Sequence, residues 1–316
     1  MYAASRITGC HGRGCAQLAD NFLIGLGVGY PFVYLLGLAA VVLAPAVIGI
    51  LWGAPLIARE LETGTFALAW TQSITRARWL AVKLALIGLT SMAVTEGLSL
   101  MLGWWAAPIG PAARLATVST PLAMGRFSLA FDAHGTTPLG YAAFAFALGV
   151  TTGLLIRRTV PAMAVTLVIF AAVQVAFPQA IRPHLFPPDH TSIAIGPGVD
   201  GVGVQLHRTV TNPNPTTVAF TVQQLSSQPG AWILSSPGVN ASGQPVSAIP
   251  AVCGQPALIS SPDFPASLAS HGMRIAVSYQ PASRYWAFQW TETAIYVVLA
   301  VALAGYCFWR ISRRLS

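Results

Sequence analysis

The fold is decided by Leu139–Phe177, which reads LGYAAFAFALGVTTGLLIRRTVPAMAVTLVIFAAVQVAF. It holds two apolar runs, 139–156 and 160–177, and each is about long enough to cross a bilayer. Only Arg-Arg-Thr at 157–159 separates them. Two spanning helices joined in a tight hairpin are therefore expected, with Thr159 as the N-cap of the second.

The composition of the whole chain agrees with a membrane protein. Of the 316 residues, 54% are hydrophobic and only 8% are charged, and the mean hydropathy is +0.63. An ordinary soluble domain carries roughly 25% charged residues. This composition excludes a soluble globular enzyme, a disordered protein and a disulfide-dense secreted module. The net charge of +8 is not gathered in a basic stripe, so no nucleic-acid partner is expected.

Three further apolar stretches are long enough to span a membrane, or nearly so. They are Leu35–Ile57, Leu80–Trp104 and Glu292–Trp309. The expected fold class is an all-α polytopic membrane protein with five spans in the lipid bilayer.

Arginine and lysine set the expected orientation. Nine basic residues are concentrated in three short segments: Arg59, Arg76, Arg78, Lys83, Arg157, Arg158, Arg310, Arg313 and Arg314. That side is predicted to be cytoplasmic, which places the C-terminus inside and, with five spans, the N-terminus outside. The first 34 residues have the composition of a loop and carry no signal peptide. We therefore expect that a first helix is missing; the alternative is a short tail that crosses unaided.

A different composition marks the long segment before the last span. It is rich in Pro, Ser, Gly and Asn, and apolar residues alternate around 202–206, 218–222 and 275–279, as in half-buried strands. The sequence thus divides into an external segment 1–34, four spanning helices in 35–177, a β-rich extracytoplasmic domain 178–287, and a last helix with a cytoplasmic tail, 288–316.

The segment 58–79 between the first two spans is the sizeable cytoplasmic element. Glu60 and Glu62 lie at the membrane exit, Gly64 allows a bend, and the apolar residues 66–70 suit a short interfacial helix. Ser73 or Thr75 can cap the helix that follows. Read alone, without its motif, this segment is better explained as an ordinary charged loop that anchors two helix ends.

Several motifs in this segment and beyond resemble ABC-2 type transporter permeases, the membrane subunits of ABC exporters, and in particular single-chain permeases of actinobacteria. The matching stretches are Ala58–Thr65, Arg76–Lys83, Pro138–Tyr141, Arg157–Ala162 and Tyr279–Trp286. The resemblance implies six membrane helices, so this chain would lack the first. It also implies a bacterial plasma-membrane location, a second permease copy as partner, and coupling of substrate export to a separate ABC ATPase subunit. The residues that match the coupling element are Arg59, Glu60, Glu62, Gly64, Thr65 and Arg76.

No Walker A motif is present, since the chain's one lysine, Lys83, is not in a G-x-x-x-x-G-K-[ST] context. We therefore expect no enzymatic activity and no cofactor or metal in this chain, with ATP and Mg²⁺ bound by the partner ATPase. Glu96 near the middle of the second span is costly in lipid and is a possible intramembrane polar site. Cys10 and Cys15 could form a disulfide in the external segment.

Two other functions compete with the permease. A membrane-anchored binding or sensor protein would use the external domain for its ligand and need no ATPase. An intramembrane enzyme would need paired catalytic groups within the spans, where the sequence offers only Glu96.

Overall fold

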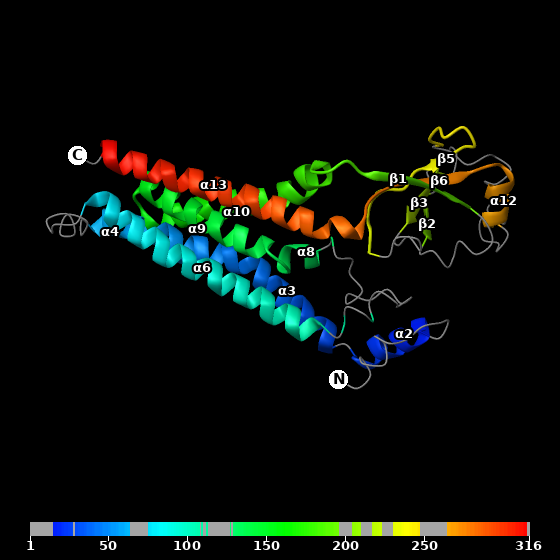
Figure 1. Ribbon diagram of the computed structural model, residues 1–316, viewed down its shortest axis with the longest axis horizontal. Helices are drawn as coiled ribbons and strands as arrows, with labels where there is room; N and C mark the ends of the chain where they lie inside the picture. The colour runs from blue at the N-terminus through cyan, green and yellow to red at the C-terminus, as the bar shows by residue number, and fades with distance from the viewer. Residues whose placement is uncertain are drawn as a thin grey trace. The chain divides into compact units, whose positions relative to one another are not determined.

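The computed structural model describes residues 15–27, 29–63, 75–107, 109, 112, 127, 129–195, 204–209, 217–222, 230–246 and 264–314 (Figure 1). The chain divides into two compact units. The first comprises Met1–Leu185 and Trp286–Ser316, and the second comprises Phe186–Tyr285.

The first unit is a helical bundle. Five of its helical segments are long and apolar enough to cross a membrane: Gly29–Thr63, Arg78–Ala106, Thr137–Ile156, Thr159–His184 and Ala282–Arg313. Its elements are α2 (Cys15–Gly25), α3 (Gly29–Ile48), the π-turn η1 (Gly49–Gly53), α4 (Ala54–Thr63), α6 (Arg76–Ala106), α8 (Leu129–Ala133), α9 (Thr137–Ile156), α10 (Thr159–Ala176), the π-turn η3 (Phe177–Ile181), the 3-10 turn η4 (Arg182–His184) and α13 (Tyr285–Arg314). The predicted fold class, a polytopic membrane protein with five spans, is confirmed.

The N-terminal segment differs from expectation. The first 34 residues were expected to form a loop, but they contain α2 and the first turn and a half of α3. Exposed apolar side chains at Tyr30, Phe32 and Val33 extend the apolar surface of α3 toward its start. The interpretation as a loop was wrong for residues 15–25 and 29–34, because short apolar stretches that fall below the length of a span still suffice for helices.

Helix α9 is the centre of the bundle. In its most apolar window 78% of the residues are buried, against 22% in the Thr159–His184 span. It packs against α3, α4, α6 and α10 (Figure 1). A Cβ atom on Gly149 would lie 2.3 Å from the carbonyl oxygen of Gly49, and one on Gly153 would lie 2.4 Å from that of Ala54. The Gly149-x-x-x-Gly153 spacing thus brings two backbones together, as such motifs do in membranes.

Proline explains one break in the helical pattern. Pro178 has no N–H group and cannot bond to the carbonyl four residues earlier. The helix widens into the π-turn η3, and Arg182 N–H donates to the oxygen of Phe177. This change of pitch carries Arg182 into the bundle, where its side chain is 3% exposed.

The second unit has its own small core. Strands β1 (Asp189–Ala194), β4 (Trp232–Ser235) and β5 (Gly238–Val239) all pair antiparallel with β6 (Arg274–Gln280). Helix α12 (Phe264–Ser270) adds Leu268 to a core with Ile195, Met273, Ile275 and Val277. Alternate β6 residues Ile275 and Val277 are buried, which is the period of two in the sequence.

A separate hairpin pairs β2 (Val204–Thr209) with β3 (Thr217–Val222) in antiparallel register, Leu206 opposite Phe220. These are two of the strands expected from alternation. The predicted turn between them, at 212–215, lies outside the described residues.

Candidate functional site

Two carboxylates at the end of α4 bind neighbouring helices. Glu60 Oε1 accepts a hydrogen bond from Lys83 Nζ on α6, and the two side chains are 32% and 23% exposed. The same ammonium lies 4.3 Å from the centre of the Trp79 ring, a cation–π contact. Glu60 thus fixes the end of α4 to the start of α6.

The second carboxylate, Glu62, caps α10. Its Oε2 accepts hydrogen bonds from the backbone N–H of Thr159 at 3.0 Å and from the Thr159 hydroxyl at 2.7 Å. Thr159 was expected to be the N-cap, which was wrong: Arg158 occupies that position without a side-chain cap bond, and Thr159 is the first helical residue. A carboxylate from another helix satisfies the exposed amide instead, and its charge favours a helix N-terminus.

The other residues of the predicted coupling element are more dispersed. Arg59 is exposed on α4, and Arg76 is the first residue of α6. Gly64 and Thr65 lie outside the described residues, as does the expected interfacial helix at 66–70. The expected cap at Thr75 is confirmed, because its hydroxyl accepts from Arg78 N–H at 3.3 Å.

Glu96 lies on α6 and is half-buried. Its Oε2 atom and the hydroxyl of Thr95 are buried without a hydrogen-bond partner among the residues that the structure describes. Lys83 and Arg182 form their ion pairs with other carboxylates, so within the described part of the chain Glu96 is not joined to either of these cations.

The cysteines fall into two environments. Cys15, at the start of α2, is disulfide-bonded. Its predicted partner, Cys10, lies outside the described residues. Cys307 on α13 is a buried free thiol 3.3 Å from the Thr151 hydroxyl.

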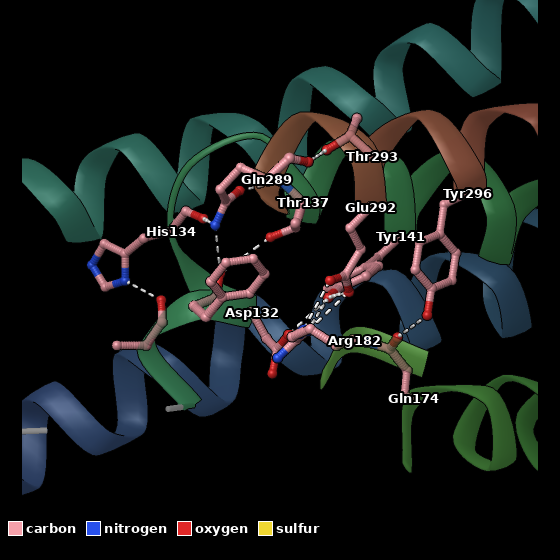
Figure 2. A network of polar contacts seen from close by, with 12 residues as sticks. Asp132, His134, Thr137, Tyr141, Gln174, Arg182, Gln289, Glu292, Thr293 and Tyr296 are labelled. Carbon is pink, nitrogen blue, oxygen red and sulfur yellow. Dashed lines mark hydrogen bonds and ion pairs between the residues drawn. The ribbon is translucent and has the colours of Figure 1, made fainter. Parts of the chain in front are cut away.

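A buried polar cluster at the other end of α10 was not found by sequence reasoning (Figure 2). Arg182 donates from Nε to Glu292 Oε2 and from Nη2 to Glu292 Oε1, both at 2.9 Å. Arg182 Nη2 also pairs with Asp132 on α8, and its guanidinium carbon lies 4.3 Å from the centre of the Phe131 ring. The Tyr141 hydroxyl joins both carboxyl groups. We call Asp132, Tyr141, Arg182 and Glu292 the Arg182 cluster.

Gln289 extends this polar region by one helical turn. Its Oε1 accepts from the backbone N–H groups of Thr136 and Thr137, both at 3.0 Å, and its Nε2 donates to the carbonyl oxygens of Phe131 and His134 at 3.1 and 3.0 Å. One amide from α13 therefore satisfies the backbone at the junction of α8 and α9. A Cβ on Gly135, whose φ is +77°, would lie 2.7 Å from Gln289 Oε1.

Glu292 was expected only as the first residue of the last span, and the structure shows that its side chain is fully buried. The missed signal was its position one turn after Gln289 and one turn before Tyr296, because these residues share one face of α13. Asp132 and Arg182 gave no such signal, since both lie outside the apolar runs that were predicted to span the membrane.

The fold defines a class, a polytopic membrane protein built around one buried helix, α9. The model of the family described as ABC-2 membrane transporter related matches residues 1–182. The chain belongs to this family, and a transporter permease role follows. No curated protein and no solved structure gives a significant match.

Proposed function

We propose that this chain is the membrane-spanning subunit of an ABC exporter, in which a separate ABC ATPase subunit binds the segment 58–79. Family membership supports the permease role. The observation that carries the coupling proposal is the pair of contacts on α4. Glu60 binds α6 and Glu62 binds α10. They stand immediately before the segment 64–75, so a displacement of that segment would act on three spanning helices.

In this proposal the basic ends of the helices face the cytoplasm, where the ATPase would dock. Arg59, Arg78, Arg157 and Arg158 are exposed at this end, and Lys83 on α6 is partly buried. A second copy of the chain completes the translocation path, and ATP-driven closure of the two ATPase subunits alternates access to it. The permease itself contributes contact and movement and no ATP chemistry.

The first experiment is co-purification from the native host in mild detergent, with the chain tagged at its C-terminus. A stoichiometric ABC ATPase subunit is the expected companion. A stable, well-folded preparation without any ATPase subunit would contradict the proposal and favour a binding or sensor protein.

A charge swap separates an intramolecular role of Glu60 from a docking role. Glu60→Lys alone should weaken ATPase association, because it breaks the pair with Lys83 and changes the surface charge. In Glu60→Lys/Lys83→Glu the pair is restored with inverted polarity. Restored association would assign Glu60 to holding α4 on α6, whereas continued loss would assign it to ATPase contact.

The matched control is Asp189→Arg/Arg284→Asp, which inverts a partly exposed ion pair in the second unit. It should leave association unchanged. If neither the Glu60 variants nor charge reversal at Glu62 alters association while insertion is normal, the coupling role of α4 is refuted.

A further inference from the structure

Two neighbouring side chains of α6 carry buried polar atoms that have no hydrogen-bond partner. These atoms are Thr95 Oγ1 and Glu96 Oε2, and within the described part of the chain no other buried side-chain nitrogen or oxygen is left in this way. Thr95 is fully buried, and Glu96 is half-buried. Buried polar groups in folded proteins nearly always have a partner, so two adjacent exceptions in one helix need an explanation.

The Thr95 hydroxyl differs from the other buried hydroxyls of the spanning helices. A serine or threonine inside a helix usually donates to the carbonyl oxygen one turn earlier. Ser91, Thr151 and Thr166 do so, with distances of 2.6, 2.7 and 2.7 Å to the oxygens of Ile87, Ala147 and Ala162. Thr95 makes no such bond, although it lies on the same helix as Ser91. Its hydroxyl therefore remains available to a ligand.

The Glu96 carboxyl lies at membrane depth beside an open apolar surface. It is ten residues before Ala106, the last residue of α6, which is about 15 Å along the helix. On the same helix Leu98 and Leu100 are exposed, and a Cβ atom on Gly97 would meet no atom within 4 Å. A ligand that reaches this carboxyl from the side thus meets apolar side chains and open space.

No cation of the protein neutralises Glu96 among the residues that the structure describes. Lys83 pairs with Glu60, and Arg182 pairs with Asp132 and Glu292. A metal ion would need further ligands, and the described residues contain no group of three histidine, cysteine or acidic side chains. Acidic residues within spanning helices usually pair with a cation or mark the path of a substrate. The occupant of this site therefore has to bring its own positive charge.

We propose that Thr95 and Glu96 form the polar part of a binding site for a protonated amine with a small apolar body. An ammonium group has three N–H donors and no acceptor. One donates to the Glu96 carboxylate and another to the Thr95 hydroxyl. Because Thr95 lies inside the bundle and Glu96 at its edge, the ammonium enters first and the apolar body stays against the surface beside Gly97. Binding does not depend on the proposed ATPase partner, whereas export of such an amine would rest on the proposed function.

Equilibrium dialysis of the full chain in nanodiscs of phosphatidylcholine tests the site with 1-adamantylamine, which is protonated at neutral pH. Binding should be saturable after subtraction of the amine taken up by empty nanodiscs. Glu96→Gln should weaken it by about tenfold or more, because the ammonium loses a charged partner, and Thr95→Val should weaken it less. The matched control is Thr90→Val, since Thr90 is exposed on the same helix and donates to the Leu86 oxygen at 2.7 Å. It should bind as wild type does.

Two analogues separate the contributions of charge and of the N–H donors. Adamantyltrimethylammonium has the charge without any N–H group, and 1-adamantanol has a donor without the charge. Both should bind more weakly than the amine. Three results would overturn the proposal: no saturable binding of the amine, equal binding by Glu96→Gln and wild type, or equal binding of the amine and 1-adamantanol.

Thermal unfolding distinguishes a binding role of Glu96 from a structural one. Without ligand, Glu96→Gln should melt no lower than wild type, because it removes a charge that has no partner in the folded chain. The amine should raise the melting temperature of wild type and leave that of Glu96→Gln unchanged. A ligand-free Glu96→Gln that melts well below wild type would assign Glu96 to folding and contradict the proposal. Failure of ATPase co-purification would refute the exporter and leave amine binding intact.

Discussion

The carboxylate of Glu62 on α4 closes the N-terminus of α10 by accepting both the N–H and the hydroxyl hydrogen of Thr159, 97 residues further along the chain. Helix caps normally come from the residue at the cap position itself. Here the residue at the cap position, Arg158, makes no side-chain cap bond, and the cap comes from another helix. The tip of the α9–α10 hairpin is thereby bound to the helix that leads into the predicted coupling segment.

This contact predicts a local change in hydrogen exchange. In Glu62→Ala the backbone N–H of Thr159, the first amide of α10, loses its acceptor, and it should exchange severalfold faster with deuterium. The rest of α10 should be unaffected, because the contact is exposed and serves only the first turn. The matched control is Glu60→Ala, two residues earlier on α4. Glu60 contacts Lys83 on α6, so this variant should leave the α10 amides unchanged. Equal exchange in Glu62→Ala and wild type would show that Thr159 is held by other groups.

The close approach of α9 to the first span predicts that Gly149→Ala is severely destabilising. The new methyl group would meet backbone atoms of Gly49 and Ala54 at 2.3 and 2.8 Å. Backbone cannot move aside as a side chain can, so the cost should reach or exceed about 1–3 kcal/mol. Detergent-solubilised Gly149→Ala should melt well below wild type. Gly97→Ala, with no atom within 4 Å of the new methyl group, should melt as wild type does.

Gln289→Leu should unfold the junction of α8 and α9. The change removes a partner from four buried or partly buried backbone groups, of which the Phe131 oxygen keeps its bond from the Thr137 hydroxyl. Each buried group left unsatisfied costs about 1–3 kcal/mol. A large drop in melting temperature is expected. Gln174→Leu loses only the 3.3 Å bond from Tyr296 and should have a much smaller effect. Similar drops in melting temperature in the two variants would show that the hydrogen bonds of Gln289 do not hold the junction of α8 and α9 together.

Arg182→Met should be among the most damaging substitutions in the chain. It leaves Glu292 buried without a counter-charge, and breaking a buried pair in this way costs about 3–5 kcal/mol. Folded yield after extraction should fall sharply. In the second unit Asp189→Asn weakens a pair whose side chains are 42% and 31% exposed, and Arg284 keeps its bonds to the oxygens of Pro187 and Gln280, so the yield should change little.

The spans could be predicted from sequence because bilayer thickness imposes a length on every apolar run. The strands β2, β3 and β6 could be predicted for a similar reason, since alternation at a period of two is local information. The start of α3 was placed too late because Gly29 to Tyr34 adds little to an apolar run that already suffices. The cap on Thr159 was misassigned because propensity rules consider only neighbours in sequence.

The Arg182 cluster shows the limit of such rules most clearly. Its four members come from four elements and are brought together by tertiary packing and by the π-turn after Pro178. A pattern within one short stretch of sequence gives no information about this tertiary contact. The predicted coupling residues Glu60 and Glu62, in contrast, were identified by their motif. The structure adds their intramolecular partners. Their role in ATPase contact stays a prediction.

Lys83 is the one lysine of the chain, and its ammonium is held between Glu60 and the Trp79 ring. An acylating reagent therefore meets a single side-chain amine, and that amine, whose side chain is 23% exposed in the closed contact, should react faster once the contact between α4 and α6 has opened. The rate of labelling would measure this opening in the native protein, in membranes and during turnover, without any introduced probe.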